Sequence, residues 1–284
     1  MSTVPVVPVP PNLQAVVANA LAEDIGSGDL TAGLVPAAAR ATATVTAREA
    51  CVLCGAPYFD AAMRQVDPHT QVTWHAGEGD LVAAQTKLCT ITGMARSLLT
   101  TERVALNFLQ TLSATATLTR RHVDALAGTR ARVVDTRKTI PGLRLAQKYA
   151  VRVGGGANHR IGLFDGILIK ENHIMAAGGI APALTAAQAQ ARPGTMIQIE
   201  VETRAQLETA IAAGAKLILL DNFTPGRMAE AVRIAAGRAE LEASGGINLD
   251  TVRTYAQTGV DRISVGALTK DIKAIDLSMR FQAG

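Results

Sequence analysis

The spacing of apolar and polar residues changes character near residue 130 of this 284-residue chain. Before that point helical spacing alternates with strand-like stretches. Helices are expected at residues 11–26 and 57–66, and strands within residues 41–55 and 70–93. A stretch free of proline and glycine, about residues 96–127, predicts one long helix suited to connect two domains. We therefore predict an antiparallel α+β domain with its connecting helix over residues 1–128.

From Arg132 onward, short apolar strands alternate with alanine-rich helical segments, which is typical of a parallel sheet. Six strands are expected, in RVVDT, DGILIK, MIQIEVE, KLILLDNF, AELEASGG and DRISVGAL. The last four end near Glu200, Asp221, Ser244 and Gly266, separated by 21, 23 and 22 residues, and such a period marks a repeated unit. Six units are fewer than the eight of a full TIM barrel. We predict an incomplete (open) TIM-like α/β barrel over residues 129–270, with a tail, residues 271–284, that returns to the first domain as an edge strand.

Composition narrows the function classes. Lys and Arg total 28 against 24 Asp and Glu, a net charge of +4, and aromatic residues make up 3%. Because nucleic-acid binding needs a concentrated basic face, we expect no nucleic-acid partner. No apolar run approaches the ~20 residues of a membrane helix, and the proline-rich start, MSTVPVVPVPPN, lacks the basic region of a secretory signal. We expect a cytosolic (cytoplasmic) protein with an extended N-terminal arm and a small anionic substrate.

Three cysteines are present, Cys51, Cys54 and Cys89. The first two have C-x-x-C spacing, but no second pair or histidine cluster accompanies them, so a zinc site has weak support. We expect buried structural cysteines, with metal or redox chemistry as the alternative.

Polar and small residues gather where the predicted barrel strands end, which is where barrels of this kind carry their chemistry. The two small-residue segments, SGG and VGA, follow the last two strands. Glycine lets backbone N–H groups approach phosphate oxygens, and a following helix N-terminus adds its positive dipole. We expect a phosphate site there, with mere tight turns as the alternative.

Four cations map near the same rim: Arg137, Lys138, Arg160 and Lys170. Because they would repel one another, either local acids compensate them or an anionic ligand binds there. Surface charge is the alternative for any one of them.

Glu200 and Asp221 end adjacent strands and are predicted at equal height. Paired carboxylates beside a phosphate pocket suggest Mg²⁺, held partly through water and substrate oxygens, and charge balance is the alternative. His159 has the chemistry to orient a carboxylate, although a lone histidine is more often a core or surface residue. A phosphate site, a pair of carboxylates suited to a metal ion and a cluster of cations together favour a phosphoribosyl pyrophosphate donor.

The segment DTRKTIPGLRLAQKYAVRVGGGANHRIGLFDGILIKENHI, residues 135–174, closely resembles the signature region of the quinolinate phosphoribosyltransferases, or carboxylating nicotinate-nucleotide pyrophosphorylases. LAEDIGSGDLT, TERVALNFLQTLSATAT, IEVET, LLDNF, SGGI and SVGALT resemble the same family in the same order. The resemblance implies an N-terminal α/β sandwich followed by an incomplete α/β barrel of about seven strands. It also implies a transferase of NAD biosynthesis that joins quinolinate to phosphoribosyl pyrophosphate with Mg²⁺. Pyrophosphate and CO₂ leave, and nicotinate mononucleotide is formed.

The resemblance also implies roles by position. Arg103, in TTERVALN, resembles an arginine that reaches into the neighbouring subunit's site, so a homodimer or higher homo-oligomer is implied. The implied quinolinate-binding set is Arg137, His159, Arg160 and Lys170, with Thr136 and Lys138 facing both substrates. Glu200 and Asp221 are the implied acidic pair near the ribose and the metal. The implied 5-phosphate loops are Ser244, Gly245, Gly246, Val265, Gly266 and Ala267. The implied catalytic residues are Lys138, Lys170, Glu200 and Asp221.

Three alternatives stay open. Lys170, at the end of DGILIK, is placed like the Schiff-base lysine of a barrel aldolase, although the adjacent Glu171 favours the charged amine. A non-catalytic phosphate-binding regulator would not need the acidic pair together with four cations. A relative in the same family with another acceptor, such as those linked to molybdenum transport, is disfavoured by the intact TRKT and NHR segments.

Overall fold

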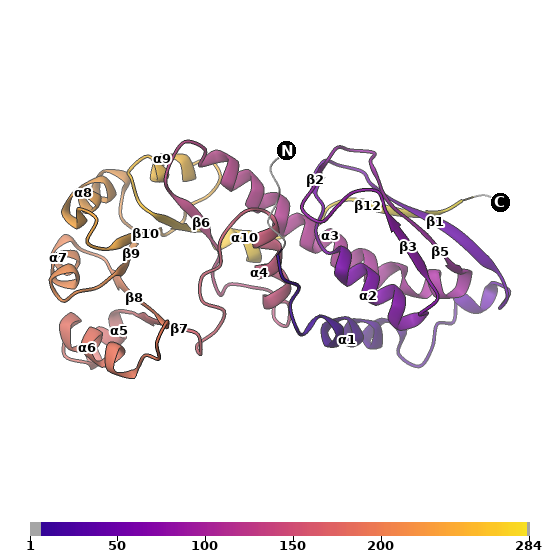
Figure 1. Cartoon of the computed structure of the whole chain (residues 1–284), viewed down its shortest axis with the longest axis horizontal. Helices are drawn as coiled ribbons and strands as arrows, with labels where there is room; N and C mark the ends of the chain where they lie inside the picture. Colours follow the sequence, from indigo (N-terminus) through magenta and orange to yellow (C-terminus); the bar gives the residue numbers. More distant parts are fainter. Residues whose placement is uncertain (1–6, 283–284) are drawn as a thin grey trace. The chain divides into compact units, whose positions relative to one another are not determined.

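The computed structural model describes residues 7–282 and divides into two compact units, whose elements are labelled in Figure 1. The first holds the residues up to Arg120, Ile140–Gly155 and the residues from Asp271 on, and the second holds Arg121–Thr139 and Gly156–Lys270. This division differs from the predicted boundary at residue 128, because Ile140–Gly155 was predicted within the barrel. Part of the predicted N-terminal arm, residues 1–6, lies outside the described residues, and residues 7–10 form no regular element.

The first unit is a sheet covered by helices. Its antiparallel sheet has the order β12-β1-β5-β3, and a separate pair joins β2 to β4. The strands are β1 (Arg40–Ala47), β2 (Cys51–Val52), β3 (Gln71–Trp74), β4 (Leu81–Val82), β5 (Lys87–Met94) and β12 (Leu277–Phe281). The helices are α1 (Leu13–Ile25), α2 (Ala56–Val66), α4 (Arg144–Val153), the 3-10 turn η1 (Ala32–Leu34) and most of α3 (Ala95–Ala125), whose last turn belongs to the second unit. The tail thus forms the edge strand that its alternation predicts, paired with β1.

The core of this unit lies between the sheet and the helices. Val45 and Ile91 point from β1 and β5 to the same fully buried cluster as Val17, Phe59 and Leu109 from the helices. Each such side chain contributes roughly 1.5–3 kcal/mol by leaving water. This arrangement is the α/β sandwich that the resemblance implies, and α3 is the predicted long helix, with 31 residues.

A carboxylate explains why Ile140–Gly155 belongs to the first unit. Gly55 precedes helix α2 at the N-cap position and has no side chain to cap it. Glu78 supplies the cap by accepting the N–H groups of Gly55 and Ala56 at 2.7 and 3.0 Å. The hydroxyl of Tyr149, on α4, donates to the same carboxylate at 2.9 Å. Helix α4 is therefore joined to this core by a hydrogen bond as well as by the burial of Tyr149 and Ala150.

The cysteines are structural, as predicted. All three are free and buried. Burial raises the pKa of the Cys51 thiol to about 11 and that of Cys89 to about 12, and it raises the pKa of Cys54 well above its usual value. Such thiols stay protonated and unreactive at neutral pH.

The second unit is an open α/β barrel. Its six parallel strands have the order β6-β11-β10-β9-β8-β7. They are β6 (Arg132–Val134), β7 (Gly166–Ile169), β8 (Met196–Val201), β9 (Leu217–Asp221), β10 (Glu240–Ser244) and β11 (Arg262–Ser264). In the described residues β6 and β7 do not pair, so the barrel is incomplete. The six predicted strands are confirmed, whereas the resemblance implied about seven; a single parallel bridge, Val134 to Ala157, extends the β6 edge.

Helices cover the outside of this curved sheet (Figure 1). They are α6 (Ile180–Gln190), α7 (Arg204–Ala212), α8 (Pro225–Ala235) and α9 (Val252–Ala256), and the short helices α5 (Glu171–Ala176) and α10 (Ala267–Lys270) follow β7 and β11. The parallel strands all direct their carboxyl ends to one rim, where the site residues follow. No helix in residues 7–282 combines the length and the hydropathy that crossing a membrane requires.

Candidate active site

A cavity of about 470 Å³ lies at the carboxyl ends of the barrel strands. Nine predicted site residues line it: Thr136, Arg137, Lys138, His159, Arg160, Lys170, Glu200, Asp221 and Ser244. The structure thus brings together side chains that are up to about a hundred residues apart in sequence, because parallel strands place their ends on one rim.

The turn after β6 is held in place by hydrogen bonds on both sides. Thr136 Oγ1 accepts the backbone N–H of Lys138 at 3.0 Å, and the hydroxyl of Thr269 donates to the Lys138 carbonyl at 2.8 Å. Gly266 leaves room for the stem of Lys138, since a Cβ there would lie 3.2 Å from its Cδ. The fold therefore fixes the backbone and the stem of Lys138, one of the two cations that follow the strand.

Two arginines lie close enough to affect each other. Burial lowers the pKa of the Arg160 guanidinium, the positive charge of Arg137 lowers it further, and Asp165 opposes the shift. Arg160 Nη1 also donates to the Gly166 carbonyl at 2.9 Å. An anion between the two guanidinium groups would relieve their repulsion, which is the electrostatic signature of an anion site.

Three carboxylates face this cation cluster. Oxygen atoms of Glu200, Glu202 and Asp221 lie within 4.8 Å of one another. In the β8–β9 pairing Glu200 is level with Leu219, so Asp221 is level with Glu202. The predicted equal height of Glu200 and Asp221 is wrong by two residues, but Glu200 and Glu202 share a face because side chains alternate along a strand.

The acidic trio has the chemistry of a magnesium site. Burial raises the pKa of Asp221, and the charge of Glu200 raises it further, while Lys170 and Lys138 oppose the shift. Carboxylate oxygens are the ligands that Mg²⁺ prefers, and a divalent cation would relieve the repulsion between these acids. The donor set therefore fits the ion, with Glu202 added to the predicted pair.

Lys170 forms an ion pair that links the two halves of the cavity. Its Nζ lies 2.7 Å from Glu200 Oε2, and half of its side chain is exposed. The partner is Glu200 on the neighbouring strand, whereas the sequence suggested Glu171. A lysine amine engaged in a close ion pair with a carboxylate is not free to attack a carbonyl, so this contact disfavours the aldolase alternative.

The small-residue loops lie beside the same rim. Gly245 and Gly246 have φ of 106° and 60°, and a Cβ at Gly245 would overlap Asn222 Oδ1. Only glycine fits this turn, which exposes backbone N–H groups. Helices α9 and α10, which follow the two loops, have only five and four residues, so the expected helix-dipole contribution is small. Val265 is buried behind the rim, and Ala267 begins α10.

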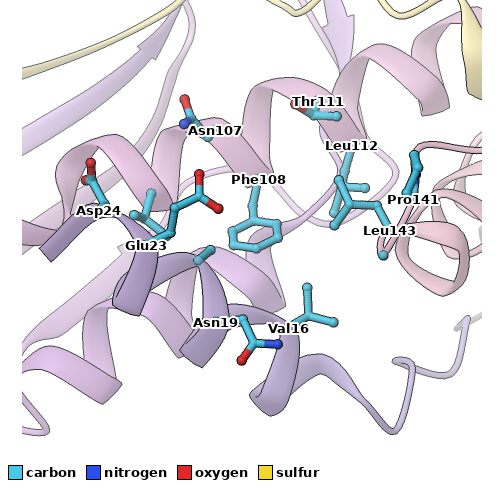
Figure 2. Close-up of a pocket in the computed structure, with 13 residues that line it drawn as sticks. Val16, Asn19, Glu23, Asp24, Asn107, Phe108, Thr111, Leu112, Pro141 and Leu143 are labelled. Atoms are coloured by element: carbon cyan, nitrogen blue, oxygen red, sulfur yellow. The ribbon is translucent and has the colours of Figure 1, made fainter. Parts of the chain in front are cut away.

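Arg103 is the one predicted site residue in the first unit. It is exposed on α3, outside the set that lines the barrel cavity. A separate hollow of about 450 Å³ lies beside this helix, between α1, α3 and residues 141–143 (Figure 2). Phe108 lies at its centre, Glu23 and Asp24 at one end, and its lining includes no cation and no predicted site residue.

Three residues that line or support the cavity were not predicted from the sequence. Glu242 and Ser264 line it, and Gln198 contacts His159 beneath it. The signal for Glu242 was present, because a charged residue in the middle of the apolar segment AELEASGG has to find a buried partner. That partner is Arg262, whose Nε lies 3.0 Å from Glu242 Oε2.

Comparisons with known proteins agree on one family. The chain matches the N-terminal domain of quinolinate phosphoribosyl transferase over residues 29–113 and its C-terminal domain over residues 115–280. It is 41% identical over 257 residues to a probable nicotinate-nucleotide pyrophosphorylase [carboxylating] of Bacillus subtilis, covering 90% of this chain and 89% of that one. A Mycobacterium leprae protein, named nicotinate-nucleotide pyrophosphorylase [carboxylating], is 42% identical over 270 residues, covering 92% and 94%. The structure of nicotinate-nucleotide pyrophosphorylase from Francisella tularensis superposes with a TM-score of 0.93 at 47% identity, covering 97% and 98%.

Proposed function

We infer the function of this chain from the family to which it belongs, the quinolinate phosphoribosyltransferases. It is a phosphoribosyltransferase of de novo NAD biosynthesis. The reaction transfers the phosphoribosyl group of phosphoribosyl pyrophosphate to quinolinate and gives nicotinate mononucleotide, pyrophosphate and CO₂. The observation that supports a site for it in the barrel is one cavity lined by four cations together with the carboxylates of Glu200 and Asp221.

Quinolinate is assigned to the cationic side of the cavity. It carries two carboxylates on adjacent ring carbons, and the guanidinium groups of Arg137 and Arg160 offer planar forks that match them. Burial lowers the pKa of Arg160 and the charge of Arg137 lowers it further; the dianion would relieve the repulsion between the two guanidinium groups. Binding would hold the ring nitrogen against the ribose, which removes much of the entropic barrier. Thr136 and His159 line the same wall.

The ribose and the pyrophosphate are assigned to the acidic side. The quinolinate nitrogen attacks C1 of the ribose while the bond from C1 to the pyrophosphate oxygen breaks, and that oxygen keeps the electron pair. The ribose develops positive charge, which Glu200 and Asp221 stabilise. Lys138 and Lys170 stabilise the negative charge that the pyrophosphate gains.

Glu200, Glu202 and Asp221 would hold the Mg²⁺ ion, since their oxygens lie within 4.8 Å of one another. When bound, the ion supplies positive charge to the pyrophosphate oxygens. The 5-phosphate is assigned to the loops of Ser244, Gly245, Gly246, Val265, Gly266 and Ala267, whose glycines let backbone N–H groups approach.

Loss of CO₂ needs no organic cofactor. Once the ring nitrogen is bonded to the ribose, the pyridinium is an electron sink. The bond from the ring to the neighbouring carboxylate breaks, CO₂ leaves, and the electron pair stays on the ring carbon until it takes a proton from water. The enzyme contributes position and charge to this step.

A homodimer, or a larger assembly built from it, is proposed to complete each site. Arg103 is exposed in the first unit, and the barrel cavity of the same chain is lined by other residues. An arginine so placed is available to a neighbouring chain, where it would add a third guanidinium to the quinolinate side. The expected cytosolic location stays a prediction, since similar proteins of rice and Arabidopsis thaliana have chloroplastic in their names.

The test is product detection by mass spectrometry, after the full chain is mixed with quinolinate, phosphoribosyl pyrophosphate and Mg²⁺. Nicotinate mononucleotide is expected only with all three, and chelation of the metal should abolish it. A folded protein that binds phosphoribosyl pyrophosphate but forms no product would refute quinolinate as the acceptor. Arg137→Ala should raise the KM for quinolinate by roughly 10- to 100-fold, through loss of charge-assisted hydrogen bonds, and leave the thermal midpoint unchanged.

A further inference from the structure

Four buried polar side chains form or support the cation-lined wall of the barrel cavity: His159 and Glu242 line it, and Asp135 and Gln198 lie outside its lining. Asp135, Gln198 and Glu242 are fully buried, and His159 is 8% exposed. They come from the end of β6, from β8, from β10 and from the loop before β7. Buried polar groups at this density are costly unless each has a specific partner, so their contacts indicate what they do.

Both ring nitrogens of His159 are engaged by the protein. Nδ1 accepts the backbone N–H of Arg160 at 2.7 Å, and Nε2 lies 2.6 Å from Gln198 Oε1. Because Nδ1 is an acceptor, the neutral ring carries its hydrogen on Nε2 and donates it to Gln198. A flipped Gln198 amide would place two donors face to face, so the network itself assigns the tautomer and the amide orientation.

Glu242 favours the same tautomer. Its Oε1 lies 3.9 Å from His159 Nε2, and its Oε2 lies 3.0 Å from Arg262 Nε. A carboxylate beside the Nε2–H side of the ring stabilises a hydrogen at that position. Glu242 on β10 thus faces the ring from a neighbouring strand, with Arg262 on β11 behind it, and the carboxylate of Asp135 holds the backbone of the same residue.

The backbone of the loop that carries Arg160 is held from a second side. Asp135 Oδ1 accepts the backbone N–H of His159 at 2.8 Å, and Asp135 Oδ2 accepts from the Asn158 side chain at 2.7 Å. The head of Arg160 is in turn held by the Gly166 carbonyl. Arg160 is therefore anchored at its backbone through His159 and at its guanidinium through Gly166.

The side chain of Gln198 makes no other hydrogen bond among the described residues. Its Nε2 is buried and lacks a hydrogen-bond partner among the described residues. An apolar side chain would avoid that cost. The amide of Gln198 therefore contributes its hydrogen bond to His159. His159 directly precedes Arg160, which is proposed to bind the substrate.

We propose that Gln198 and His159 are positioning residues that act through Arg160, fixing the guanidinium in the quinolinate side of the cavity. The imidazole serves as a rigid link between strand β8 and the Arg160 backbone, and its ring nitrogens remain with the protein when quinolinate binds. This inference rests on the proposed function, because it takes Arg160 as a ligand of quinolinate.

Nitrogen-15 NMR spectra of the histidine side chains test the link between Gln198 and the Arg160 backbone directly. The full chain has five histidines, and a His159→Gln variant identifies the signal of His159. The expected signal is that of a neutral ring with hydrogen on Nε2, and saturating quinolinate should leave both nitrogen shifts in place. An imidazolium, a mixture of tautomers, or a ring-nitrogen shift on adding quinolinate would overturn the proposal.

Kinetics separate positioning from mere stability. Gln198→Met keeps the length of the side chain and removes the acceptor. It should raise the KM for quinolinate roughly tenfold while kcat and the KM for phosphoribosyl pyrophosphate change less than about twofold. Leu207→Val, a buried change in α7 of the same unit, serves as the stability control and should leave all three constants unchanged. An unchanged quinolinate KM in Gln198→Met, or equal shifts in both variants, would contradict the positioning role.

The proposed function and the positioning role of Gln198 and His159 are refuted by different results. If wild-type protein forms no nicotinate mononucleotide, the proposed function is wrong, and the His159 tautomer without ligand still decides whether the buried link exists. If wild-type protein is active but quinolinate shifts the His159 nitrogens, the function stands and the positioning role is wrong.

Discussion

Arg103 offers the sharpest test of how the site is assembled, because it and Lys138 belong to different units of one chain. If Arg103 acts in the neighbouring chain, Arg103→Ala and Lys138→Ala damage the same site from two subunits. Each change removes a charge-assisted hydrogen bond to an anion, worth about 1.5–3 kcal/mol, so each homodimer should lose roughly 10- to 100-fold in kcat/KM.

A mixed dimer of the two variants should recover activity. One of its sites combines both defects, but the other pairs the intact Lys138 of one chain with the intact Arg103 of its partner. A two-fold dimer has two equivalent sites, so the mixed dimer should show about half of the wild-type rate.

The assay uses co-expression of the two variants with different affinity tags, sequential purification on both tags, and release of nicotinate mononucleotide as the readout. Native mass spectrometry verifies that both chains are present. The same purification with two wild-type chains sets the reference rate. A verified mixed dimer that is no more active than its parents would refute the reasoning, and so would a chain that remains monomeric yet fully active.

Three further predictions concern the units separately. Gly245→Ala should raise the KM for phosphoribosyl pyrophosphate roughly tenfold, because the added Cβ overlaps Asn222 and the positive φ costs about 1–3 kcal/mol. Gly237→Ala is the control, since Gly237 has φ of 75° and its Cβ would have no neighbour within 4 Å. Equal KM values in the two variants would contradict the phosphate assignment. Glu78→Gln should cost about 1.5–3 kcal/mol of stability by weakening the cap of α2, and Tyr149→Phe only about 1 kcal/mol, measured as thermal midpoints. Equal midpoints for the two variants would contradict a special role of the cap. Burial raises the pKa of Asp60 above its unfolded value, so the contribution of this carboxyl to folding stability falls as pH rises through the raised pKa. Asp60→Asn should therefore raise the thermal midpoint of unfolding at pH 7 but not at pH 3. A lower thermal midpoint at pH 7 would contradict this prediction.

Much of the barrel site was predictable because the second half of the chain repeats one unit, a strand followed by a helix. Each strand is short, apolar and followed by polar or small residues, and a parallel sheet must place all those ends on one rim. Arg137, Lys170 and Asp221 were therefore predicted to meet, and they line one cavity. The buried cysteines were predictable for a similar local reason, since they lie within strand-like segments that have no metal-ligand partners nearby.

Contacts between distant residues were not predictable in the same way. Lys170 pairs with Glu200, thirty residues away, although Glu171 is its neighbour in sequence. Neither partner carries a local signal for the other, because their approach depends on the β7–β8 register. The same reason hides Gln198, which looks like any polar residue in a strand until His159 is placed above it.

The sequence alone determined the order and type of the elements and the set of residues at the strand ends, because these follow from local periodicity. Only the tertiary structure decided which of those residues share a level, which chain segments belong to which core, and which buried groups support the site. In the structure Asp221 is level with Glu202, although it was predicted level with Glu200, and Ile140–Gly155 belongs to the first unit, although it was predicted in the barrel. The physical reason is that register and burial are set by packing between segments far apart along the chain, where no single segment carries the information.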